Sequence, residues 1–136
     1  MILKTGLILS VALMCACGTK KTAVSTSIDG NWTILEVDGE KVADVEKTPE
    51  ITFNTKENRV NGNAGCNNFF GSINYAGGKL KFGDDMGATR MMCKNMKFED
   101  KALQSFPKVA KVTRKGDRLF LQDESGKNLF VLEKAK

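Results

Sequence analysis

Two segments, VNGNAGCNNFFG at residues 60–71 and MGATRMMC at residues 86–93, carry the most information about the fold. Glycine and polar residues gather in both of them without a simple turn signal. The first segment does not match a phosphate-binding loop, because no Lys-Ser or Lys-Thr pair follows and no helix opens after it. We expect its glycines to permit positive φ angles and a close backbone crossing near Cys66. Asn67 and Asn68 are expected to hydrogen-bond local backbone in a bulge or tight corner.

The sequence on both sides of these segments is typical of short strands separated by turns. Residues 31–37 (NWTILEV) predict a mostly buried strand, and Asp38-Gly39 is a turn signal after it. Further apolar runs flank turn residues and predict hairpins. The expected pairs are 51–53 with 59–61, 69–75 with 79–82 around Gly77-Gly78, 109–114 with 118–122, and 118–122 with 128–132.

One segment, residues 95–106, has the periodicity of a helix instead. Its apolar stripe consists of Phe98, Ala102, Leu103 and Phe106. Asn95 is the expected N-cap, Glu99 and Asp100 lie near the positive end of the helix dipole, and Pro107 ends the helix. The predicted fold is therefore α+β and β-rich. It consists of an antiparallel, half-open, barrel-like sheet of about seven or eight strands with one helix packed on it.

The N-terminal segment has the features of an export signal. Residues 1–17 read MILKTGLILSVALMCAC, with one Lys and then an apolar stretch that is shorter than the roughly 20 residues needed to span a membrane. Residues 14–18 resemble the lipobox of bacterial lipoproteins, with Cys17 at the acylated position. This resemblance implies a signal peptide at 1–16, a membrane anchor through lipid on Cys17, and a polar tether at 17–27. A plain secretory signal is the open alternative.

Composition narrows the function classes for the one remaining domain, residues 28–136. The formal net charge is +5, but acidic residues are interspersed among the basic ones, which indicates a solvated surface and argues against nucleic acid as a partner. The chain contains no His. Catalysis by Ser-His or Cys-His pairs is therefore excluded, and the commonest transition-metal ligand is absent.

Two cysteines, Cys66 and Cys93, belong to the expected mature domain. An even pair in an oxidising compartment predicts a structural disulfide. Free buried thiols and a redox-active pair are the open alternatives, although the C-x-x-C spacing of redox pairs is absent. No metal site is predicted, since zinc usually takes about four Cys or His ligands.

The order of motifs resembles the META domain family, which includes the heat-shock protein HslJ. Gly30-x-Trp32 opens the domain, the two quoted segments follow on either side of a Gly-Gly hairpin, and a helix with an acid comes next. The resemblance covers about residues 28–134. Its most diagnostic residues are Gly65, Cys66, Asn67, Thr89, Arg90, Met91 and Cys93. The family implies a small β-rich fold with one helix, often in secreted or lipid-anchored bacterial proteins, and a Cys66–Cys93 disulfide.

These observations favour a non-catalytic protein without a cofactor. Asp84-Asp85 is better explained as a turn than as a carboxylate pair, since neighbouring strand residues point to opposite faces. Arg90 is expected to pair with Glu99 or Asp100 and hold the helix rather than bind an anion. The expected function is partner binding or support of the envelope under stress, at the outer membrane in preference to the inner membrane. The sequence predicts no oligomeric state.

An alternative function is a carrier or sensor for a hydrophobic small molecule or acyl chain. Methionine and aromatic surfaces adapt to varied apolar ligands. The candidate lining residues are Phe69, Phe70, Met86, Met91, Met92 and Met96. A pocket of several hundred Å3 lined by these residues would favour the carrier. The other explanation of this set is that it fills the core beneath the helix.

Overall fold

The computed structural model describes residue 18 and residues 26–136. Cys17, the predicted signal peptide and residues 19–25 of the predicted tether lie outside the described residues. Within them, no helix is long and apolar enough to cross a bilayer. The elements are β1 (Gly30–Val37), β2 (Glu40–Lys41), β3 (Glu50–Asn54), β4 (Arg59–Asn63), β5 (Asn68–Ala76), β6 (Lys79–Phe82), β7 (Gly87–Ala88), α1 (Lys97–Ser105), the 3-10 helix η1 (Phe106–Lys108), β8 (Lys111–Lys115), β9 (Arg118–Gln122) and β10 (Asn128–Lys134).

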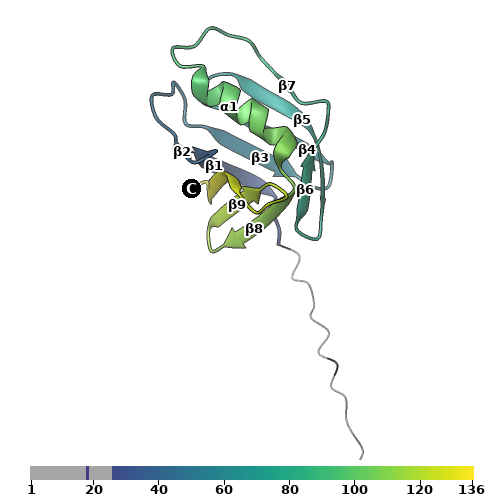
Figure 1. The fold of residues 1–136 in the computed structure, drawn as a ribbon. Helices are drawn as coiled ribbons and strands as arrows, with labels where there is room; N and C mark the ends of the chain where they lie inside the picture. Colours follow the sequence, from purple (N-terminus) through teal and green to yellow (C-terminus); the bar gives the residue numbers. More distant parts are fainter. Residues whose placement is uncertain (1–17, 19–25) are drawn as a thin grey trace, which may run out of the picture.

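The strands form an antiparallel ring (Figure 1). Neighbouring strands follow the order β10-β9-β8-β6-β5-β4-β3-β1, and the pairing of β10 with β1 closes the ring. The two-residue strand β2 pairs with β1, and the two-residue strand β7 pairs with β5. The pairing of β6 with β8 is the shortest in the ring, because its register contains a single residue pair, Lys79 with Lys111. The predicted α+β, half-open arrangement is confirmed, and the ring is not a regular barrel.

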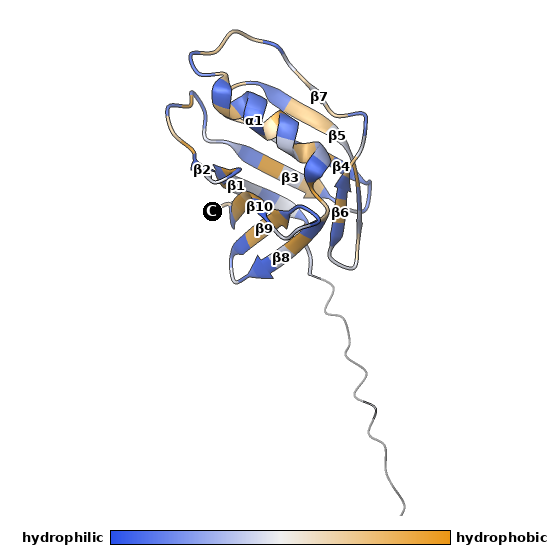
Figure 2. Ribbon diagram, in the orientation of Figure 1, coloured by the Kyte–Doolittle hydropathy of each residue, from blue (hydrophilic) through white to orange (hydrophobic). Residues whose placement is uncertain are grey.

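Alternation along the strands places one set of side chains inside the ring. In β5, for example, Phe69, Gly71 and Ile73 are buried, whereas Phe70 and Asn74 are exposed. Figure 2 shows the corresponding mixture of hydrophobic and hydrophilic residues along the strands. The largest fully buried side chains are Ile28, Trp32, Ile34, Ile51, Phe53, Phe69, Leu80, Phe106, Phe130, Leu119, Leu121 and Leu132.

The helical segment packs against this core through its apolar stripe. Phe98 and Ala102 of α1 are buried, and Phe106 of η1 stacks on Phe130 with ring centroids 4.9 Å apart. The predicted N-cap is wrong by one residue. Met96 occupies the N-cap position without a side-chain cap, while Asn95 Oδ1 accepts a hydrogen bond from Lys97 N at 3.2 Å.

The chain joins the ring at the end where the β5–β6 hairpin turns. Tyr75 Oη donates to Thr26 O at 2.5 Å, and Arg114 Nη1 donates to Ser27 O at 3.2 Å. Lys134 Nζ lies 4.7 Å from the centre of the Trp32 ring, which is fully buried. These contacts fix the point at which the predicted tether meets the domain.

Asp38, in the turn after β1, is expected to give stability that depends on pH. Lys127 Nζ lies 2.5 Å from Asp38 Oδ1. The hydrogen bond from Lys127 is the largest effect and lowers the pKa of Asp38 below the ordinary 3.8; burial opposes it with the next largest effect, and the charge of Lys127 adds a smaller lowering effect. A carboxyl with a depressed pKa stabilises the fold above its unfolded-state pKa, and this contribution disappears as the pH falls through the folded-state pKa.

We therefore expect Asp38→Asn to cost about 0.5 kcal/mol at neutral pH and low salt. Asparagine tolerates the positive φ of 48° at this position, so backbone strain does not confound the comparison. Urea unfolding of both proteins between about pH 7 and pH 2.5 should show the difference shrinking below about pH 4. A difference that is constant across this range would contradict the assignment.

Candidate functional site

The two diagnostic sequence segments meet at one end of the ring. Cys66 and Cys93 form a disulfide with their Cα atoms 6.4 Å apart, which confirms the predicted bridge. Gly65 adopts a φ of +112°, and a Cβ there would press against the Val45 side chain. Of the three glycines in residues 60–71, Gly65 alone has the expected positive φ, and the close backbone approach beside Cys66 is the hydrogen bond from Lys47 N to Gly65 O at 2.9 Å.

Asn67 joins the segments that meet at this end of the ring, because its side chain binds a segment that is distant in the sequence rather than local backbone. The Oδ1 atom accepts hydrogen bonds from Met91 N at 2.7 Å and from Thr89 Oγ1 at 3.0 Å, while Nδ2 donates to Met91 O at 3.1 Å. The amide thus pairs with the Met91 backbone as a neighbouring strand would. Asn67 lies in a tight corner as expected, where Ala64 N donates to Asn67 O at 3.4 Å, but the prediction that its side chain binds local backbone is wrong, because that side chain holds the 89–93 segment in place.

Asn67 also binds the helix through Glu99. Its backbone N donates to Glu99 Oε1 and its Nδ2 donates to Glu99 Oε2, both at 2.9 Å. Asn67 is 1% exposed and Glu99 is 3% exposed, so these bonds are shielded from water. The prediction that Arg90 pairs with Glu99 or Asp100 is wrong, because Asn67 binds both carboxylate oxygens of Glu99 and Asp100 forms no ion pair in the part of the chain that the structure describes. Arg90 is exposed and forms no ion pair within the described residues.

A third segment, the connection between β2 and β3, packs on the same corner. Lys47 N donates to Gly65 O at 2.9 Å, and Lys94 N donates to Glu46 Oε1 at 3.3 Å. A carboxylate oxygen of Glu46 and the sulfurs of Cys66 and Cys93 consequently lie within 4.8 Å of one another. Among the described residues, this group is the candidate for holding a metal ion.

The Asp84-Asp85 pair forms a turn, as predicted. Asp85 Oδ1 accepts hydrogen bonds from Ser72 Oγ at 2.6 Å and from Ser72 N at 2.9 Å. These two bonds lower the pKa of Asp85, and the charge of Arg59 adds to the effect. The carboxylate therefore ties the turn to β5.

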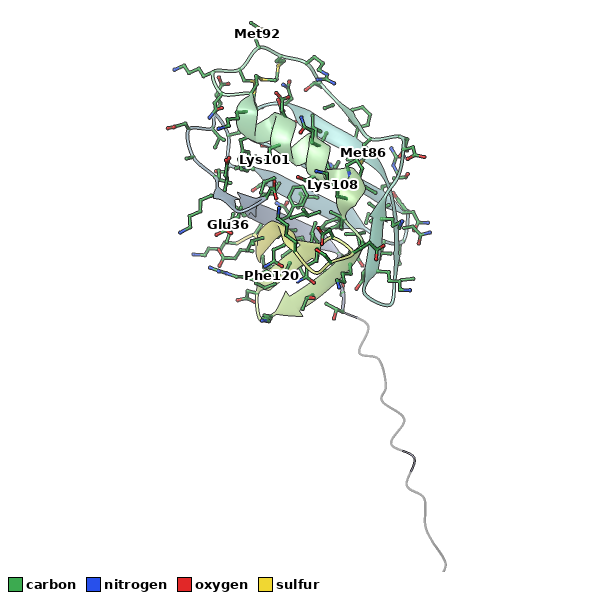
Figure 3. All side chains as sticks on the ribbon, viewed as in Figure 1. Glu36, Met86, Met92, Lys101, Lys108 and Phe120 are labelled. Atoms are coloured by element: carbon green, nitrogen blue, oxygen red, sulfur yellow. A yellow bond between two sulfur atoms is a disulfide. The ribbon has the colours of Figure 1, made fainter. Side chains whose placement is uncertain are left out.

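The segment at residues 89–95, which we call the methionine loop, presents apolar side chains to solvent. Met92 is fully exposed and Met91 is 51% exposed; Met92 lies at the tip of the domain in Figure 3. Phe70, on the outer face of β5, is 48% exposed. The prediction that six aromatic and methionine residues line one pocket or fill the core is wrong for these three. Phe69 lies in the core, and Met86 and Met96 are half-buried.

The methionine loop and the start of the ring lie at opposite ends of β5. Asn68 O accepts a hydrogen bond from Thr89 N at one end, and Tyr75 binds Thr26 at the other end. A strand rises about 3.3 Å per residue, so these two points are roughly 23 Å apart. The loop therefore projects away from the point at which the predicted tether enters the domain.

A half-open hollow of about 440 Å3 lies between the end of β6, the turn after it, α1 and η1. Its wall includes Phe82, Met86 and Leu103, all partly buried and packed against the core. Lys81 and Asp84 contribute charged groups to the same wall. Of the six residues predicted to bind an apolar ligand, Met86 is the one that lines this hollow.

Comparisons with known proteins agree with this fold. The sequence profile of the META domain matches residues 25–136. Two NMR structures, the second of a protein from Burkholderia xenovorans, have a similar fold, each with a TM-score of 0.59 and 24% sequence identity. The similarity covers 76% of this chain and 86% of the first protein, and 79% and 83% for the second. No curated protein matches the chain.

Proposed function

The chain belongs to the META domain family, and we propose that it is a non-catalytic, lipid-anchored envelope protein that binds a partner protein through the methionine loop. The observation that carries this proposal is the exposure of Met91 and Met92, which are neighbours in the methionine loop; Phe70 is also exposed, on the outer face of β5. Exposed apolar side chains that gather in one region mark interaction surfaces. Methionine, aromatic residues and arginine are enriched in protein interfaces, and Arg90 lies within the same loop.

Rigidity of the methionine loop supports the proposal. The Asn67 amide binds the backbone of Met91, and the Cys66–Cys93 bridge fixes the loop at Cys93. A binding surface on a fixed backbone loses less conformational entropy when the partner docks, which favours affinity. The buried Asn67–Glu99 pair thus serves to present the exposed side chains.

The orientation of the domain suits the same role. If Cys17 carries lipid, the membrane lies on the side of the tether, and the methionine loop points away from it. The loop then faces components of the envelope rather than the anchoring bilayer. Cys17→Ser is the control for the anchor and should release the protein from the membrane fraction.

Photocrosslinking tests the partner. A photoreactive amino acid at position 92 of the full chain, in intact cells, is expected to give one defined heavier product. The matched position is Lys56, which is exposed in the β3–β4 turn beside the Asp29–Thr55 hydrogen bond, at the tether end. Met91→Ser should weaken the product at position 92. An equal product at both positions, or none at position 92, would contradict the proposal.

The hollow beside the end of β6 supports a carrier function as a second candidate. Its volume of about 440 Å3 falls within the range of small-molecule sites, and Phe82, Met86 and Leu103 form an apolar part of a wall that also carries the charges of Lys81 and Asp84. Native mass spectra of protein purified from membranes distinguish the two functions. A co-purifying mass beyond the N-terminal acyl groups, lost on replacing Leu103 by a charged residue, would favour the carrier.

A further inference from the structure

The corner around the disulfide brings three potential metal ligands together from three separate segments. Glu46 comes from the β2–β3 connection, Cys66 from the β4–β5 corner and Cys93 from the methionine loop, and their ligand atoms lie within 4.8 Å of one another. Two hydrogen bonds hold this approach: Lys47 N donates to the backbone oxygen of Gly65, and Lys94 N donates to the side-chain Oε1 of Glu46. The arrangement of the three groups is thus built into the fold.

We propose that the reduced form of this corner is a binding site for Zn2+, with Cys66, Cys93 and Glu46 as its protein ligands. Thiolate sulfur and carboxylate oxygen are both ordinary zinc ligands, and the two thiolates disfavour Mg2+ and Ca2+. Three protein ligands leave the fourth tetrahedral position for water. The disulfide and the metal compete for the same sulfur atoms, so oxidation of the pair releases the ion.

Formation of the site requires a dithiol reductant. One thiolate of the reductant attacks a sulfur of the Cys66–Cys93 bond, forms a mixed disulfide and releases the other cysteine as a thiolate. The second thiol of the reductant then closes its own disulfide and releases the remaining cysteine. The two electrons therefore pass to Cys66 and Cys93, and Zn2+ displaces a proton from each thiol when it binds.

Reduction breaks the Cys66–Cys93 bridge, which is one of the restraints on the methionine loop, and the loop can then make the required movement. Two sulfurs bound tetrahedrally to zinc at about 2.3 Å are separated by roughly 3.7 Å, so the pair must open beyond bonding distance. Cys93 is half-buried in a loop without regular structure, whereas Cys66 is 6% exposed in a fixed corner. Asn67 Nδ2, whose two N–H groups bind Met91 O and Glu99 Oε2, lies 3.8 Å from Cys93 Sγ, so its partial positive charge lies beside a metal-bound thiolate.

Cobalt and zinc titrations of the full chain test the site. After reduction with a phosphine under anaerobic conditions, Co2+ is expected to give a thiolate-to-metal absorption band that equimolar Zn2+ removes. The reduced chain and reduced Cys93→Ser both contain Cys15 and Cys17, so the band of the proposed site is the difference between their two spectra. The oxidised chain should lack this band. Glu46→Gln should weaken zinc binding at least tenfold, while Glu57→Gln, at an exposed site elsewhere, should leave it unchanged.

Alkylation of the unmutated chain gives a second measurement that does not depend on the folding of a variant. Saturating Zn2+ should slow modification of both Cys66 and Cys93 in the reduced chain, as located by mass spectrometry of peptides. Alkylation that is equally fast with and without Zn2+ would overturn the proposal. A cobalt band of equal intensity in the reduced chain and in Cys93→Ser would overturn it as well, because the metal would then be bound elsewhere.

Discussion

Replacing Asn67 by aspartate is expected to destabilise the domain by about 3–5 kcal/mol, the cost of leaving a buried charge without its partner. The new oxygen would replace Nδ2, which donates to Glu99 Oε2 and to Met91 O. Two carboxyl groups would then face each other in a site shielded from water. A loss of this size is a large part of the stability of a small domain, which is typically 5–15 kcal/mol. Urea unfolding followed by circular dichroism would measure it.

Asn68→Asp is the matched control, because it makes the same chemical change at the next residue. Asn68 is exposed, so we expect an effect within about 0.5 kcal/mol. The deficit of Asn67→Asp should narrow at acidic pH, because one proton shared between the facing carboxyl groups restores a hydrogen-bond donor. Equal stability of the two variants would contradict the assignment of Asn67 as the residue that joins the 89–93 segment and the helix.

Reduction of the Cys66–Cys93 bridge is expected to lower stability by about 3.5 kcal/mol, as the chain-entropy estimate gives for a loop of this length. The two cysteines are 27 residues apart, and the bridge closes the span that contains β5, β6 and β7. The loss should be measured by urea unfolding with and without a phosphine reductant. A chelator must be present, so that no metal compensates for the broken bond.

Hydrogen exchange should locate the effect of reduction. Asn67 still holds Met91 after the bridge is broken, so we expect faster exchange mainly at residues 92–95, with Met91 N remaining protected. The double variant Cys66→Ala and Cys93→Ala should behave like the reduced protein. If reduction leaves the unfolding midpoint unchanged, the bridge contributes nothing to stability and serves another role.

Most of the sheet could be predicted from the sequence, because its strands alternate and its turns carry clear signals. The hairpin at Gly77-Gly78 is an example, since both glycines take the positive φ angles that a two-residue turn needs. The short strands β2 and β7 could not be predicted, because two residues show no periodicity. Their pairing with β1 and β5 depends on tertiary contacts.

The disulfide of the site could be predicted from the sequence, whereas the hydrogen bonds of Asn67 could not. An even pair of cysteines predicts a bridge, but nothing local indicates that Asn67 reaches Glu99, 32 residues away. Glu99 has the sequence signal of an ordinary acid in the first turn of a helix. The exposure of Met91 and Met92 was missed for a related reason. Apolar residues predict burial, whereas Met91 and Met92 are held outward by the disulfide and by hydrogen bonds to Asn67, which is distant in the sequence.

The closure of the ring by β1 and β10 has a consequence for the order of folding. These strands come from opposite ends of the domain, and Trp32 pairs with Lys134. The ring therefore cannot close until the last strand has been synthesised, however early the central hairpins form. Domains dominated by pairings between distant residues fold slowly, in milliseconds to seconds. Until then, β1 has an unpaired edge, and the Trp32 side of the core stays open to other chains.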